Sequence, residues 1–124
     1  MILGIGTDIT EVTRIAKSIE NDSFKIKVFS KIEIAYCDSK TNIAESYAAR
    51  FAAKEAFFKA LGTGLRGGIA FNEVEIVNDN LGKPSIHLIG KTSEIIFGKN
   101  IQTIHVSLSH VKDMAMATVI LEGL

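Results

Sequence analysis

Two acidic residues and a lysine offer the clearest chemistry in this chain. Asp8 follows the glycine-containing segment Gly4–Gly6, and Glu55 lies four residues before Lys59 in a stretch of helix-forming residues. Two carboxylates from distant segments can hold Mg²⁺, which prefers oxygen ligands and keeps several waters. Two simpler interpretations stay open. Asp8 could satisfy free amides at a helix start, and Glu55 and Lys59 could form a solvated ion pair worth only about 0.3–0.5 kcal/mol.

Further cations accompany these acids. Arg50 and Lys54 are four residues apart and form a second pair on the same predicted helix. Lys83 precedes Pro84, which is the single proline of the chain. Together with Lys59, these cations could neutralise a polyphosphate, which is the main electrostatic requirement of phosphoryl transfer.

Two histidines flank an apolar strand segment near the end of the chain. His105 and His110 differ by five positions, so on a strand they point to opposite faces and cannot easily share one metal ion. Either could act as a base or bind phosphate, although a structural histidine is the commoner case. The serine, histidine and aspartate order of common hydrolases is missing from the sequence.

A long helix must carry Glu55 and Lys59. Asn42–Glu45 fits a capping box that opens this helix, and Gly62 can adopt the left-handed conformation that ends it. Residues at three- and four-residue steps predict one apolar, buried face; they are Tyr47, Phe51, Phe58 and Leu61.

A strand over Ile2–Thr10 must carry Asp8. Its two glycines predict close approach of another backbone or a ligand. Thr10 can cap a following helix over Glu11–Ile19, and the capping box at Ser30 predicts a short helix to about Cys37.

The remaining elements are predicted as hairpins and one short helix. Their segments are Phe71–Val77 paired with Ser85–Ile89, a helix over Lys91–Gly98 with Ile95, Ile96 and Phe97 inward, and Thr103–Leu108 paired with Met114–Leu121. The pattern predicts an α+β fold with a mostly antiparallel sheet packed against the long helix, forming a single domain over residues 1–124.

Composition narrows the class of protein. Fourteen cations balance fourteen anions, which argues against nucleic-acid binding driven by bulk charge. No apolar run approaches the ~20 residues of a transmembrane helix, and the start lacks the basic region of a signal peptide. The lone cysteine suits a reducing compartment. We therefore expect a cytoplasmic protein without membrane or nucleic-acid partners.

The most basic region lies in the first third of the chain. Its cations are either an ordinary solvated surface or a docking patch for an acidic partner; they include Arg14, Lys17, Lys25, Lys27 and Lys31.

Four motifs follow one another from near the first residue to the last hairpin. They are Gly4–Ile9 with Arg14–Ile15, Arg50–Ala56 with Lys59–Gly64, Gly82–Pro84, and His105–His110. Together they resemble the holo-acyl-carrier-protein synthases, which are short 4′-phosphopantetheinyl transferases, and the chain has the right length for that family.

The resemblance implies a reaction and a site. The serine hydroxyl of an apo acyl carrier protein would attack the β-phosphate of coenzyme A, and adenosine 3′,5′-bisphosphate would leave. Asp8 and Glu55 would hold Mg²⁺, and Lys59 would lie near the transferred phosphate. The proton acceptor stays open between a metal-bound water, Glu55 and a nearby carboxylate. Matches to regions lining the coenzyme A site are Arg50, Lys59, Gly62, Lys83, Pro84 and His105.

The resemblance also implies partners and an assembly. The family packs as a homotrimer with active sites at subunit interfaces, and carrier-protein activation implies fatty-acid synthesis. Arg14, Lys17 and Lys25 would dock the acidic carrier protein. Many family members look richer in arginine here, and lysine lacks arginine's bidentate fork, which affects partner preference. The alternatives are a non-catalytic coenzyme A or nucleotide-binding module and a purely structural α+β oligomer.

Overall fold

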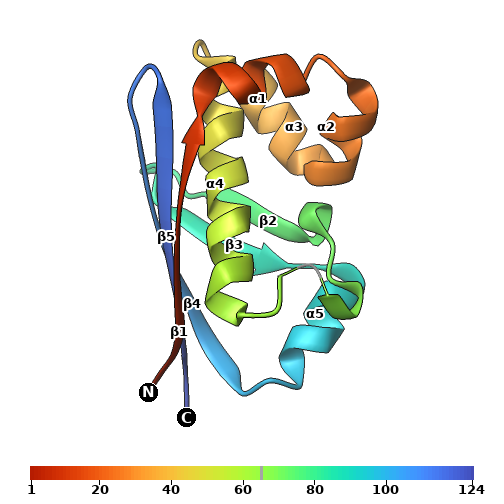
Figure 1. Cartoon of the computed structure of the whole chain (residues 1–124), viewed down its shortest axis with the longest axis vertical. Coiled ribbons are helices and arrows are strands. Elements are labelled where there is room, and N and C mark those ends of the chain that lie inside the picture. Colours follow the sequence, from red (N-terminus) through yellow and green to blue (C-terminus); the bar gives the residue numbers. More distant parts are fainter. Residues whose placement is uncertain (65) are drawn as a thin grey trace.

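A three-stranded antiparallel sheet joins the two ends of the chain (Figure 1). Its strand order is β1 (Ile2–Glu11), β5 (Met114–Gly123) and β4 (Ile101–His110). The amino-terminal nitrogen of Met1 donates a hydrogen bond of 2.9 Å to the carbonyl oxygen of Gly123. The predicted first strand and the last hairpin are confirmed, and they form one continuous sheet.

The computed structural model describes residues 1–64 and 66–124, and its central element is helix α4 (Ile43–Leu61). This helix lies against β1 and β5 (Figure 1). Most of its residues from Tyr47 to Ala60 are buried. The helix is therefore buried on several sides, whereas a single buried face was predicted. The helix ends as predicted at Gly62, whose φ of 78° is the left-handed conformation that glycine adopts without strain.

The glycines of β1 let this strand lie directly on α4. A Cβ atom at Gly4 or Gly6 would stand 2.0 Å from the carbonyl oxygen of Ala60 or Ala56, respectively. The prediction of a close backbone approach is confirmed, and the partner is the helix backbone. Because side chains alternate along a strand, Asp8 lies on the same face as these glycines and therefore points toward α4.

A second, two-stranded antiparallel sheet packs beside α4. Its strands are β2 (Val74–Asn78) and β3 (Pro84–Leu88), which confirms the predicted first hairpin. The predicted start at Phe71 was too early, because residues Phe71–Glu73 form the 3₁₀ turn η2. The α+β class and the antiparallel pairing are both confirmed, with two sheets in place of one.

Short helices gather at the two ends of α4 (Figure 1). Residues 22–28 form a helix that was not predicted, and Asn21 caps it by accepting hydrogen bonds from the amides of Ser23 and Phe24. The short elements are α1 (Val12–Ser18), α2 (Asp22–Val28), α3 (Lys31–Asp38), η1 (Arg66–Gly68) and α5 (Gly90–Phe97).

The predicted helix caps had mixed outcomes. The capping box of Ser30 and Glu33 is present with both of its hydrogen bonds. Asn42 precedes α4 but makes no side-chain cap, so the second capping box was wrong. Thr10 does not cap α1 either, because the strand continues through Glu11, which is the capping position.

Two further features complete the fold. Ile96 is buried as predicted, but Phe97 is 90% exposed because it closes α5 on the side away from the core. Within the described residues, none of the helices has both the length and the apolar character needed to cross a bilayer.

Candidate active site

Asp8 and Lys59 meet where β1 crosses α4. The Lys59 ammonium donates to Asp8 Oδ1 at 3.1 Å and to the carbonyl oxygen of Thr7 at 3.0 Å. Among the described residues, no ion pair is recorded for Glu55. Glu55 and Lys59 therefore do not form the surface ion pair considered above. Lys59 of α4 pairs instead with Asp8 of β1.

The Glu55 carboxyl group is close enough to Asp8 for the charge of Asp8 to shift its pKa. Burial raises the pKa of Glu55, the negative charge of Asp8 raises it further, and the positive charges of Lys59 and Arg14 oppose the shift. A half-buried carboxylate repelled by a neighbouring carboxylate is stabilised when a cation lies between them. The two predicted acids therefore do come together, from β1 and α4.

Asp8 is held by its own strand. The hydroxyl of Thr10 donates a hydrogen bond of 2.8 Å to Asp8 Oδ2. Helix α1 begins at Val12 with Glu11 as its capping residue, so Asp8 does not serve as a helix-start carboxylate. The simple interpretation of Asp8 as a helix-start carboxylate is thus removed.

A hollow of about 330 Å³ opens beside these groups. Its lining combines the carboxylate, the ammonium and the glycine-rich end of α4; the residues are Glu55, Phe58, Lys59, Gly62 and Gly64. The predicted site residues Glu55, Lys59 and Gly62 are therefore neighbours. Residue 65, which follows Gly64 in the chain, lies outside the described residues.

Arg50 lies in a different hollow, of about 190 Å³, which also includes Pro84. Arg50 is 3% exposed, its guanidinium lies 4.0 Å from the centre of the Tyr36 ring, and one terminal nitrogen donates to Asn78 Oδ1. Its Nε is the buried side-chain polar atom without a partner in the part of the chain that the structure describes. A buried donor of this kind suits an incoming anionic or polar group.

Lys83 and Pro84 follow the turn of the β2–β3 hairpin. The amide of Lys83 donates to Asp79 Oδ1 at 2.9 Å, and the Lys83 side chain is exposed. Gly82 lines the same hollow as Arg50 and Pro84. The structure thus brings Arg50 and Pro84 to one hollow, on another side of α4 from Glu55, whereas the exposed Lys83 precedes Pro84 without lining that hollow.

Lys54 does not belong to either hollow, which corrects its assignment as a phosphate-facing cation. The side chain is fully buried, and its ammonium donates to Glu33 Oε1 at 2.7 Å and to the carbonyl oxygens of Phe71 and Val74 at 2.8 and 2.7 Å. Helix α3 and strand β2 cover this face of α4. All three of its donors are used within the fold.

The two histidines point to opposite faces of β4, as the spacing predicted. His105 contacts Glu122 Oε1 at 2.9 Å on the outer face of the sheet. His110 contacts Glu45 Oε1 of α4 at 3.0 Å and lines the hollow that holds Arg50. Within one chain, the structure therefore places His110, and not the predicted His105, beside Arg50.

The predicted docking cations differ in exposure and in ion pairing. Arg14 and Lys17 are exposed on α1. Arg14 also lies 5.7 Å from the centre of the Phe51 ring, near the Glu55 end of the site. Lys25 is half-buried and pairs with Asp38 Oδ2 at 3.4 Å.

Sequence reasoning missed several residues around the site. Tyr36 and Asn78 line the Arg50 hollow, and Thr10 holds Asp8. The sequence offered a signal only for Thr10, because residues two apart on a strand share a face. Tyr36 and Asn78 come from separate elements, and no local spacing connects them.

Comparisons with known proteins identify the family of this chain. A family model described as the 4′-phosphopantetheinyl transferase superfamily matches residues 4–119. The chain is 48% identical to a holo-acyl-carrier-protein synthase of Geotalea daltonii, over 98% of this chain and 99% of that protein.

Two solved structures show the same fold. The crystal structure of the Neisseria meningitidis holo-acyl-carrier-protein synthase matches with a TM-score of 0.91 and 35% identity, over 98% of this chain and 99% of that one. The Bacillus anthracis synthase, solved in complex with coenzyme A (3′,5′-ADP), matches with a TM-score of 0.82 and 36% identity, over 100% and 99%. The resemblance seen in the motifs is confirmed, and the chain belongs to the 4′-phosphopantetheinyl transferase superfamily, among the holo-acyl-carrier-protein synthases.

Proposed function

We propose that this protein transfers the 4′-phosphopantetheine group from coenzyme A to a serine of an apo acyl carrier protein. The products are the holo carrier protein and adenosine 3′,5′-bisphosphate. The observation that carries the proposal is the meeting of Asp8, Glu55 and Lys59 in a chain similar along its whole length to holo-acyl-carrier-protein synthases. A non-catalytic binding module has no need of two mutually repelling carboxylates beside a lysine.

The site suits Mg²⁺, with Asp8 and Glu55 as its two protein ligands. Both donors are carboxylate oxygens, and the repulsion that raises the pKa of Glu55 is relieved by a cation. The described residues include no cluster of three or more His, Cys, Asp or Glu side chains placed to hold a metal. Two ligands are compatible with Mg²⁺, which keeps several waters. When bound, the ion supplies polarisation of the diphosphate and stabilisation of the leaving group.

The side chains of the protein then bind and orient the diphosphate. Lys59 is 55% exposed at its side chain and provides a fixed positive charge at the mouth of the hollow. Arg50 offers a buried guanidinium donor, and Lys83 adds an exposed cation beside Pro84. Phosphoryl transfer depends mainly on such charge neutralisation and in-line positioning.

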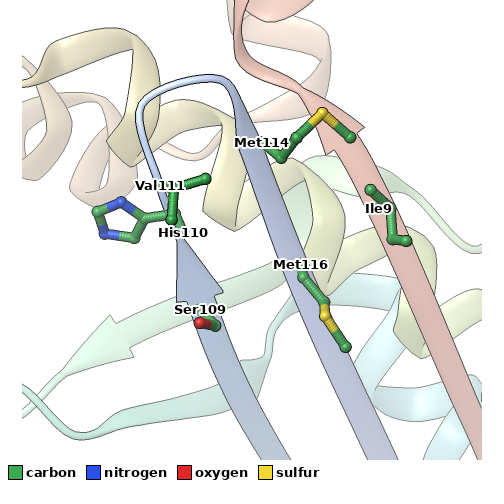
Figure 2. Close-up of a pocket in the computed structure, with 6 residues that line it drawn as sticks. All are labelled: Ile9, Ser109, His110, Val111, Met114 and Met116. Carbon is green, nitrogen blue, oxygen red and sulfur yellow. The ribbon is translucent and has the colours of Figure 1, made fainter.

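We further propose that the working form is a homotrimer with active sites between subunits. The outer face of the sheet exposes large apolar side chains; Ile5 and Ile9 are 65% and 62% exposed. Figure 2 shows Ile9 of β1 beside Met114 and Met116 of β5, around a hollow of about 350 Å³. An apolar surface of this kind is typical of an interface.

The distribution of the predicted coenzyme A residues supports the same assembly. Glu55 and Lys59 line one hollow, Arg50 and Pro84 line another, and His105 lies on the outer face of the sheet. In the proposed trimer, a neighbouring copy would supply the part of this set that one chain does not. One chain alone does not bring the whole set together.

The carrier protein docks on α1 in this proposal. Arg14 is exposed there and close enough to lower the pKa of Glu55, so it links the docking surface to the site. Acidic partners are steered by such cations. Arg14→Ala should raise KM for the carrier protein much more than KM for coenzyme A, measured by steady-state kinetics. An equal rise in both constants would contradict the docking role.

The test of the activity is mass spectrometry of an apo acyl carrier protein incubated with this protein, coenzyme A and Mg²⁺. We expect a gain of one phosphopantetheine mass on the carrier serine, lost with EDTA and with Glu55→Gln. Glu94→Gln, on the exposed side of α5, is the matched control and should keep the activity. No gain from folded protein with several carrier proteins would favour the binding module, and a gain that survives Glu55→Gln would remove the metal site.

We also propose a pathway and a location for this reaction. Carrier-protein activation serves fatty-acid synthesis, and we propose that it takes place in the cytoplasm, where the single cysteine of the chain would stay reduced.

A further inference from the structure

Thr10 is a buried polar residue next to the proposed metal site. Its side chain is only 3% exposed, and its hydroxyl lies 2.8 Å from Asp8 Oδ2. Buried hydroxyl groups normally have a hydrogen-bond partner, because an unpaired one loses its bonds to water. Asp8 is the side-chain partner that the structure records for this hydroxyl among the described residues.

Two ordinary roles for this threonine do not fit. It does not cap α1, since Glu11 holds that position and the helix begins at Val12. Its backbone pairs with Ala115 in the sheet, and any β-branched residue could fill that position. The hydroxyl group therefore serves the contact with Asp8.

The contact divides the two oxygens of the Asp8 carboxylate between different partners. Oδ2 accepts the Thr10 hydroxyl, and Oδ1 faces the Lys59 ammonium at 3.1 Å. Residues two apart on a strand point to the same face, so β1 presents both side chains to α4 together. The branched threonine side chain is stiff at χ1, which fixes the direction of its hydroxyl.

We propose that Thr10 is a positioning residue that holds Asp8 Oδ2, so that Oδ1 is presented to a cation. This inference rests on the proposed function, because it assigns Mg²⁺ to Asp8 and Glu55. Hydrogen-bonded partners of metal ligands orient them, and loss of such a partner typically weakens metal affinity about 10–100-fold.

The test uses Thr10→Val, which keeps the shape of the side chain and removes the hydroxyl. Mn²⁺ is the probe, titrated into the protein with bound coenzyme A and without a carrier protein, and free Mn²⁺ is measured by electron paramagnetic resonance. We expect the Mn²⁺ Kd to rise about tenfold or more. Thr10→Ser keeps a hydroxyl and should stay near the parent value.

Two controls separate positioning from a general loss of structure. Ser93→Ala removes a half-buried hydroxyl from α5, far from β1, and should leave the Mn²⁺ Kd unchanged. The activity of Thr10→Val should recover at high Mg²⁺, so that the Mg²⁺ requirement rises while kcat at saturation stays near the parent value. A merely structural role would lower kcat at every Mg²⁺ concentration.

The outcomes distinguish this inference from the proposed function. If the parent binds Mn²⁺ and Asp8→Asn does not, but Thr10→Val binds as the parent does, the positioning role is wrong and the metal site stands. If the parent itself binds no Mn²⁺, the proposed metal site is wrong, and so is the proposed role of Thr10.

Discussion

Helix α4 carries two lysine–carboxylate pairs whose surroundings differ sharply. Lys54 and Glu33 are 2.7 Å apart, and both side chains are 0% exposed. Lys59 and Asp8 are 3.1 Å apart, with side-chain exposures of 55% and 15%. The same two chemical groups thus form an enclosed pair on one side of the helix and an open pair on another.

The number of fixed partners decides what each pair can do. Lys54 donates to Glu33 and to two carbonyl oxygens, while Glu33 also accepts the backbone amides of Ser30 and Ile76. Burial lowers the pKa of Lys54, and the charge of Glu33 opposes that shift. The enclosed pair joins α3, α4 and β2 permanently. Lys59 faces solvent and can exchange Asp8 for a phosphate group.

The largest expected effect is the loss of stability caused by Lys54→Met, which removes the cation of the enclosed pair. The variant leaves Glu33 buried without its cation, and breaking a buried ion pair from one side typically destabilises a protein by about 3–5 kcal/mol. We expect a loss of that size in the free energy of unfolding, measured by urea titration followed by circular dichroism. Protein concentration must be held fixed, because an oligomer's apparent stability depends on it.

Lys59→Met is the matched control for that measurement. Its partner Asp8 keeps the hydrogen bond from Thr10, and an exposed pair is worth only about 0–1 kcal/mol. Equal destabilisation by the two substitutions would contradict the distinction between the enclosed and the open pair.

Lys59→Met should instead reduce the activity. Removing one preorganised charge from a transition state typically lowers kcat about 10²–10³-fold. The same change should tighten Mg²⁺ binding, because Lys59 no longer competes for Asp8 Oδ1. Steady-state kinetics and a Mn²⁺ titration measure the two effects on one preparation. Weaker metal binding in this variant would show that Lys59 supports the metal and does not compete with it.

Much of this arrangement was predictable from the sequence, because it depends on local signals. The two glycines of β1 predicted a close approach, and Gly62 marked the end of the long helix. Alternation and turn residues located both hairpins. Residue types suggested that Asp8 and Glu55 could share a metal ion, but only the family resemblance made that pairing specific, since no spacing connects residues on different elements.

The position of Lys54 shows why the rest was harder. Lys54 lies three residues after Phe51 and four before Phe58, so it shares the face that was predicted to be apolar. Periodicity identifies the buried face only when the opposite face is polar, and α4 is rich in alanine on several sides. Its charge was therefore assigned to a phosphate ligand. The carboxylate that pairs with it, Glu33, comes from another helix, and no spacing along α4 indicates that partner.

The smallest expected effect is that of Glu55→Gln on the free energy of unfolding. It tests whether the Glu55 charge stabilises the fold, as that of Glu33 does, or serves the function. Burial and Asp8 raise the pKa of Glu55 above its usual value of 4.5. A raised pKa means that the folded protein holds the proton more tightly than the unfolded chain. The stabilising contribution of this group is therefore present below the unfolded-state pKa and is lost as pH rises through the folded-state pKa.

Above that range, in the absence of metal, the Glu55 carboxylate is a destabilising charge that Glu55→Gln removes. We expect Glu55→Gln to be more stable than the parent at neutral pH by less than about 1 kcal/mol, because solvent screens a half-exposed carboxylate. Urea titrations with EDTA at several pH values measure the difference, which should shrink as pH falls through the raised pKa. Mg²⁺ should reduce the difference at neutral pH, because it stabilises only the protein that binds it. A parent that is more stable than Glu55→Gln at neutral pH in EDTA would mean that Glu55 serves the fold, as Glu33 does.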